Sequence, residues 1–163
     1  MDWNNLYRMQ KELDAYIVEH HHLDKQDVFS KKLLALLVEL GEMANETRCF
    51  KFWSTKPPSE KNVILEEYVD VLHFMLSIGI DTGFRYHPKN DIKQESEKNI
   101  TSQFLDLFQI CTNFGRQPNG ETYTNMFEAY LMLGNALDFQ EDDIERMYLE
   151  KNNTNYKRQD DGY

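Results

Sequence analysis

Hydrophobic residues recur at intervals of three and four positions along six stretches of the chain, near 3–19, 28–48, 60–82, 98–113, 121–138 and 141–152. This spacing places apolar side chains on one face of a helix, whereas a surface strand would alternate apolar and polar residues. No stretch shows sustained alternation, and all four prolines fall between the six stretches. The pattern predicts an all-α fold, a helical bundle.

The length of the chain, 163 residues, is typical of one domain. Two polar segments, 85–99 and 113–122, are short and have predicted helices on both sides, so they are expected to be connections within a domain. We therefore predict a single domain over residues 1–163.

Two predicted helices carry acidic residues where their pattern calls for apolar ones. In LLALLVELGEMANE, residues 33–46, Glu39 and Glu42 lie three positions apart, within about 60° on a helix surface. Glu67 and Asp70 have the same spacing on the next long helix. The first of these helices is apolar nearly all round, which predicts burial, and a buried carboxylate needs a counter-charge. Antiparallel packing would bring the four carboxylates together.

Four carboxylates without cysteine or histidine form an all-oxygen site of the kind that suits Mg²⁺ or Mn²⁺. A di-iron carboxylate bundle would require Glu-x-x-His, which neither acidic pair contains. His73 follows Asp70 by three positions, and we expect it to line a pocket rather than to bind metal. The predicted cofactor is Mg²⁺, two or three ions per site, with Mn²⁺ as a substitute.

Charge and composition exclude several classes of function. The net charge of −10 argues against non-specific binding to nucleic acid or membrane surfaces, which needs a basic surface. No apolar run reaches the roughly 20 residues of a membrane span, and the first residues lack a signal-peptide pattern. The two cysteines have neither metal-type nor redox-type spacing. These features predict a cytoplasmic protein whose phosphate substrate arrives together with cations.

Three further motifs carry polar chemistry. Gln10 and Asp14 interrupt the apolar stripe of the first helix, one turn apart, as hydrogen-bonding side chains. Lys51 and Trp53 lie between the acidic helices and offer a positive charge and an apolar wall. The final stretch, EKNNTNYKRQDDGY, supplies charged and neutral donors suited to phosphate at Lys151, Asn155, Arg158 and Tyr163.

Together these motifs resemble the all-α nucleoside triphosphate pyrophosphatases, and in particular the dimeric dUTPase family. The resemblance rests on the ExxE and ExxD pairs, on Gln-x-x-Leu-Asp, Lys-x-Trp and Asp-x-x-His-Phe, and on the final Lys-Asn-x-x-Asn-x-x-Arg-Gln-x-x-Gly-Tyr. It implies that Gln10 and Asp14 read the uracil and sugar, with Phe74 against the ring and His73 close by. It also implies that Lys51 and Trp53 border the nucleotide. Lys151, Asn155, Arg158 and Tyr163 would bind the phosphates.

The resemblance implies Mg²⁺-dependent hydrolysis of dUTP, and also of dUDP, to dUMP in a homodimer. A metal-activated water would be the nucleophile, with Glu39 as general base and with Lys151 and Arg158 stabilising charge on the phosphates. The attacked phosphorus is not fixed by the sequence. Two alternatives remain open: a pyrophosphatase for another or a damaged nucleotide, and a helical binding protein or a dUTPase that also binds a regulatory protein, as phage-encoded relatives do.

Overall fold

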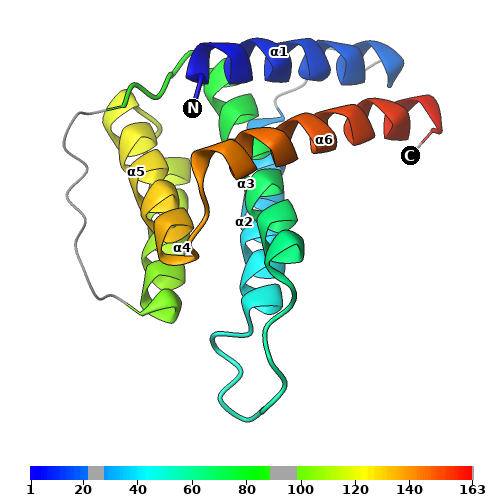
Figure 1. Ribbon diagram of the computed structural model, residues 1–163. Coiled ribbons are helices and arrows are strands. Elements are labelled where there is room, and N and C mark those ends of the chain that lie inside the picture. The colour runs from blue at the N-terminus through cyan, green and yellow to red at the C-terminus, as the bar shows by residue number, and fades with distance from the viewer. Residues whose placement is uncertain (22–27, 89–98, 163) are drawn as a thin grey trace.

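The computed structural model of the protein describes residues 1–21, 28–88 and 99–162, and within these ranges the chain forms six helices and no strand (Figure 1). The helices are α1 Trp3–His20, α2 Phe29–Thr47, α3 Lys61–Thr82, α4 Ile100–Arg116, α5 Gly120–Ala136 and α6 Glu141–Asp160. The all-α prediction is confirmed. None of the described helices is long and apolar enough to cross a membrane.

Helix α3 lies at the centre of the bundle and packs against α1, α2, α5 and α6. Helices α2 and α3 run side by side, α4 and α5 form a second pair beside them, and α1 and α6 lie together across one end of the α2–α3 pair (Figure 1). Residues on nearly every side of α3 are therefore buried, among them Val69, Leu72 and Leu76. This central position allows α3 to present side chains to α1, α2 and α6 at once.

Helix α2 corrects one prediction, because it is not buried all round. Leu36, Leu40 and Met43 are fully buried, but Leu34 is 63% exposed and Val38 is 49% exposed. The reason is its place at the edge of the bundle, where, among the described helices, α3 and α4 pack closest to it. Apolar residues on the remaining side of the helix face outward.

Helix α6 continues to Asp160, whereas the sequence pattern predicted an end near residue 152. Its apolar periodicity stops after Tyr148, but the polar side chains of Lys151 and Asn152 are also buried. One turn further on, the ring of Tyr156 packs edge-on against Tyr16 of α1, with 4.9 Å between ring centroids. Polar burial and an aromatic contact thus hold a helical segment that has no apolar stripe.

Buried tyrosines fix α3 against α5. The rings of Tyr68 and Tyr130 stack with centroids 4.1 Å apart, and each hydroxyl donates to the backbone carbonyl of the other residue, at 3.2 and 3.0 Å. The polar end of each ring is thereby satisfied inside the core. Gly134 is needed for this approach, because a Cβ there would lie 2.3 Å from the Tyr68 hydroxyl.

Candidate active site

An acidic cluster lies where α2 and α3 face each other. Carboxylate oxygens of Glu39 from α2 and of Glu67 and Asp70 from α3 all lie within 4.8 Å of one another. The three-residue spacing puts both α3 acids on one side of that helix, and antiparallel packing brings Glu39 opposite to them. All three side chains are partly buried. The structure therefore brings together three of the four predicted metal ligands.

The fourth predicted ligand, Glu42, lies one turn along α2 from Glu39 and is exposed. It is not part of the three-residue group. Its negative charge nevertheless acts on the cluster, since it contributes to raising the pKa of both Glu39 and Glu67. Glu42 is thus placed at the rim of the cluster, on the solvent side.

The cluster resists full ionisation. Burial, followed by the charges of Asp70 and Glu42, raises the pKa of Glu39 to about 7. The same causes raise the pKa of Glu67 to about 6. Burial also raises the pKa of Asp70, although Lys151 opposes the shift. Three acids that repel each other in a partly dehydrated site form a natural binding site for cations.

The raised pKa values predict how stability changes with pH in EDTA, without bound metal. A carboxyl whose folded pKa lies above its ordinary value of 4.5 costs nothing while protonated, and destabilises the fold as pH rises through about 6 for Glu67 and about 7 for Glu39. After allowance for solvent screening, we expect these two carboxyl groups together to lower the free energy of unfolding by roughly 1–2 kcal/mol between pH 5 and pH 8.

Buried His73 acts in the opposite direction, because burial lowers its pKa to about 3 and its neutral form is favoured as pH rises. The measurement is therefore the difference in unfolding free energy between the wild-type chain and Glu39→Gln/Glu67→Gln, by urea titration at pH 5 and pH 8. The free energy of unfolding of the double variant, relative to that of the wild type, should be higher at pH 8 than at pH 5. Equal pH dependence in both proteins would contradict the cluster electrostatics.

A lysine from α6 provides the counter-charge that the sequence called for. Lys151 is buried, and its Nζ lies 2.6 Å from an oxygen of Asp70 and 2.9 Å from an oxygen of Glu66. Glu66 had not been predicted as a site residue, because it lies outside the ExxD pair. Glu66 meets Lys151 because α6 crosses α3 at this point, which the sequence pattern does not reveal.

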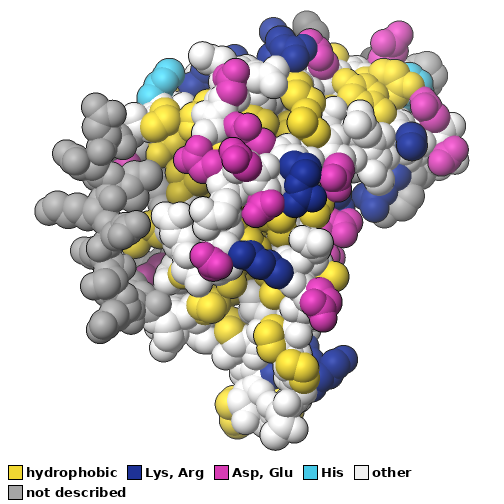
Figure 2. Space-filling view, viewed as in Figure 1, with side chains coloured by type: hydrophobic (Ala, Val, Ile, Leu, Met, Phe, Trp, Pro, Cys, Tyr) yellow, Lys and Arg dark blue, Asp and Glu magenta, His cyan; other side chains and the backbone are white. Residues whose placement is uncertain are grey.

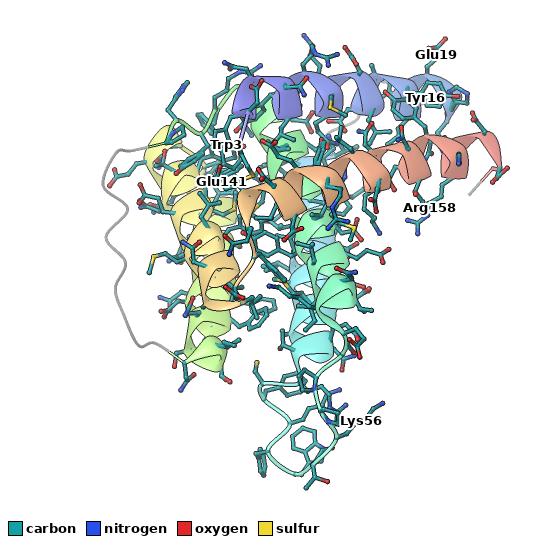
Figure 3. The ribbon with its side chains drawn as sticks, viewed as in Figure 1. Trp3, Tyr16, Glu19, Lys56, Glu141 and Arg158 are labelled. Carbon is teal, nitrogen blue, oxygen red and sulfur yellow. The ribbon has the colours of Figure 1, made fainter. Side chains whose placement is uncertain are left out.

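A pocket of about 1050 Å³ opens beside the cluster, between α1, α2, α3 and the second half of α6. Eight of the predicted site residues line it: Gln10, Asp14, Glu39, Asp70, His73, Phe74, Asn155 and Arg158. Figure 3 shows Arg158 extending from α6 on the side away from α1. Its positive charge acts on Asp70 and lowers the pKa of that carboxyl, although burial prevails. Segments far apart in sequence thus form one site.

Two predicted nucleotide residues lie elsewhere. Lys51 and Trp53 are in the loop that joins α2 to α3 and projects from the end of the bundle, the loop that carries Lys56 in Figure 3. Trp53 is 66% exposed, and the Lys51 ammonium bonds the side chain of Asn45. Neither residue lines the pocket. Tyr163, also predicted, lies outside the described residues.

Inside the pocket, Gln10 is the centre of a hydrogen-bond network. Its Nε2 donates to Asp14 at 2.8 Å, and its Oε1 accepts a hydrogen bond from the Tyr148 hydroxyl at 2.9 Å. The same oxygen lies 2.7 Å from Nδ1 of His73. Tyr148 had not been predicted, since its place in the α6 pattern indicates only a core position.

Asp14 is held by two further groups. The Ser77 hydroxyl donates to Oδ2 at 2.7 Å, and the Lys32 ammonium lies 3.7 Å from that oxygen. Burial raises the pKa of Asp14, while Lys32, Ser77 and Gln10 oppose the shift. A nearby cation and two donors thus partly offset the effect of burial on this carboxyl.

A fold that is helical over the described residues, with an acidic cluster that opens into a pocket of amide, carboxylate and guanidinium groups, is typical of the all-α nucleotide pyrophosphatases. The chain belongs to the all-α dUTPase family, whose model matches residues 2–163. It is therefore an enzyme with dUTP diphosphatase activity. Comparison with curated proteins found no match. Enzymes of this family use a divalent metal, and the group formed by Glu39, Glu67 and Asp70 offers it ligands.

Proposed function

We propose that the protein hydrolyses dUTP, and also dUDP, to dUMP with release of pyrophosphate or phosphate, using Mg²⁺. The observation that carries this proposal is the placement of the acidic cluster at the edge of the Gln10 pocket, with Glu39 and Asp70 belonging to both. A nucleotide whose base enters the pocket would have its phosphates near the carboxylates. Mn²⁺ should substitute, because it accepts the same oxygen ligands.

The residues present fit a hard divalent cation. The ligand atoms are carboxylate oxygens, and burial together with the neighbouring negative charges raises the pKa of Glu39 and of Glu67, which a bound cation would relieve. We propose Glu39, Glu67 and Asp70 as direct ligands and Glu42 as a ligand that completes the site from its rim. When bound, Mg²⁺ supplies charge neutralisation for the phosphates and lowers the pKa of the attacking water.

Glu39 is the proposed general base. It lines the pocket from the α2 side, opposite the two α3 acids. A base at this position can receive the proton of a water that attacks a phosphate held at the cluster.

Lys151, Arg158 and Asn155 are proposed to bind the phosphates from α6. Arg158 and Asn155 line the pocket, at successive turns of the helix. Lys151 is paired with Asp70 and Glu66 in this structure, so it must give up Asp70 to reach a phosphate oxygen. Charged donors of this type stabilise the negative charge that develops on transferred phosphate.

The test of the proposed function is product analysis. Purified protein is incubated with dUTP or dUDP and Mg²⁺, with and without EDTA, and the products are resolved by ion-exchange chromatography. We expect dUMP only in the presence of metal, with preference for dUTP over dCTP and dTTP in direct competition. Equal hydrolysis of the three triphosphates would favour the alternative of a broader nucleotide pyrophosphatase.

The projecting loop requires a separate explanation if Lys51 and Trp53 border the nucleotide. Figure 2 shows hydrophobic side chains at the tip of this projection, where Phe50, Phe52 and Trp53 are exposed. Within one chain these residues lie away from the pocket. We propose that they act only after the loop moves or when a second copy supplies them.

A homodimer is proposed on related grounds. Leu34 and Val38 of α2 and Leu105 of α4 are exposed apolar residues on helices that pack against each other, and Leu105 is 66% exposed. Apolar surface of this kind is typical of interfaces between identical subunits. Light scattering should give twice the chain mass of 19.5 kDa, and Leu34→Glu/Val38→Glu should shift the protein toward the monomer. A wild-type monomer would contradict this proposal.

A further inference from the structure

The amide of Gln10 is held at both ends, so its orientation is fixed. A carboxylate can only accept hydrogen bonds, and the Asp14 carboxylate lies 2.8 Å from one end of the amide. That end must therefore be the N–H end. The oxygen then faces the Tyr148 hydroxyl at 2.9 Å and Nδ1 of His73 at 2.7 Å. The reversed amide would place its oxygen 2.8 Å from a carboxylate oxygen that has no hydrogen to give.

The oxygen end leaves no capacity for a ligand. Because Gln10 Oε1 accepts, His73 must donate from Nδ1, and the buried ring is neutral with its lone pair on Nε2. The Tyr148 ring stacks on the His73 ring, with centroids 4.2 Å apart, so both donors to the oxygen are held together. Tyr148 has one hydrogen to give, and its alternative, the carbonyl of Leu6, is further away at 3.4 Å. Both lone pairs of Oε1 are thereby occupied.

What Gln10 can offer a base is the second hydrogen of Nε2, since the first is directed to Asp14. Asp14 lies one turn along α1 in the same pocket, and each of its oxygens retains an acceptor site after bonding Gln10 and Ser77. The pocket therefore presents a donor next to an acceptor. Uracil carries the complementary pair, a carbonyl next to N3–H. With its C4 group in the same position, toward Gln10, cytosine presents the opposite pair, an amino group next to an unprotonated N3.

We propose that Tyr148 is a positioning residue for base selectivity: its hydroxyl holds Gln10 with the amide N–H toward the base, and so favours uracil over cytosine without touching the nucleotide. This inference rests on the proposed function of the pocket. It adds a residue of α6 to base recognition and predicts which substrates are affected. Thymine has the same donor and acceptor edge as uracil, so selectivity between these two bases should not depend on Tyr148.

The test is Tyr148→Phe, which removes the hydroxyl and keeps the ring that stacks on His73. We measure kcat and KM for dUTP, dCTP and dTTP at saturating Mg²⁺. The expected result is a rise in KM for dUTP and a fall of about five- to tenfold in the ratio of kcat/KM for dUTP over dCTP. The ratio for dUTP over dTTP should stay unchanged. General damage to the site would lower all three activities together and leave both ratios as they are.

The matched control is Tyr130→Phe, which removes a buried tyrosine hydroxyl that also donates to an oxygen, but in the α3–α5 core away from the pocket. It should change neither ratio. If Tyr148→Phe does not fold, Tyr148→Met also lacks the donor and fills the space with a flexible side chain. An unchanged dUTP to dCTP ratio in a folded Tyr148 variant, with wild-type protein active on dUTP, would overturn this inference alone. A wild-type chain inactive on dUTP would overturn the proposed function as well.

Discussion

Replacing Glu67 by glutamine should lower kcat for dUTP by about 10³-fold or more while the protein remains folded, and Asp70→Asn should do the same. Each change removes one negative charge from a three-carboxylate group whose oxygen atoms lie within 4.8 Å of one another. The cation would then be held less precisely and would neutralise less of the phosphate charge. The measurement is single-turnover hydrolysis at saturating Mg²⁺, with circular dichroism to confirm helical content.

Stability provides the internal control for this prediction. Without metal, Glu67→Gln should melt at a temperature equal to or about 2 °C above that of the wild type, because the substitution removes a charge that Asp70 and Glu42 repel. Glu42→Gln tests whether Glu42 binds the metal directly or acts on the site only through its charge. A large loss of activity supports direct binding as a fourth ligand, and a loss below about tenfold indicates a purely electrostatic contribution. Near-normal turnover in both Glu67→Gln and Asp70→Asn would place the chemistry elsewhere.

Lys151→Met should lower activity by about 10²–10³-fold, the range observed when one donor to developing negative charge is removed. It should also destabilise the metal-free protein by about 2 kcal/mol, because Asp70 is left partly buried without its cation and Glu66 loses its partner. Urea unfolding in EDTA measures the stability term. Added Mg²⁺ should recover part of the lost stability and none of the lost activity.

Lys157→Met is the matched control, since Lys157 is exposed on the same helix. It should leave both activity and unfolding free energy close to wild type. If Lys151→Met proved as stable as the wild type in EDTA, the ion pair seen here would not be the counter-charge of the acidic cluster.

The fold and the acidic cluster could be predicted because both follow from local periodicity. Residues three apart share a helix face whatever surrounds them, so Glu67 and Asp70 had to point the same way. Gln10 and Asp14 are one turn apart on α1 and meet in the same pocket for the same reason. The extent of α2 burial was overestimated, since Leu34 and Val38 are apolar yet exposed at the edge of the bundle.

The remaining contacts depend on how helices cross, which periodicity does not encode. The pairing of Lys151 with Glu66 exists only because α6 crosses α3 at that turn. The contact of Tyr148 with Gln10 joins residues 138 positions apart in sequence. Likewise, nothing in the Lys-x-Trp spacing indicates that the loop carrying Lys51 and Trp53 projects away from the pocket. Local pattern identifies the chemistry, and helix packing decides which groups meet.

We propose that Glu39, Glu67 and Asp70 bind the divalent metal that the reaction uses. Isothermal titration calorimetry of Mg²⁺ into the nucleotide-free protein tests this without relying on turnover. We expect saturable binding to the wild-type chain and none to Glu39→Gln/Glu67→Gln/Asp70→Asn, with helical content unchanged. Equal Mg²⁺ binding by the wild-type and triple-variant proteins would contradict the account.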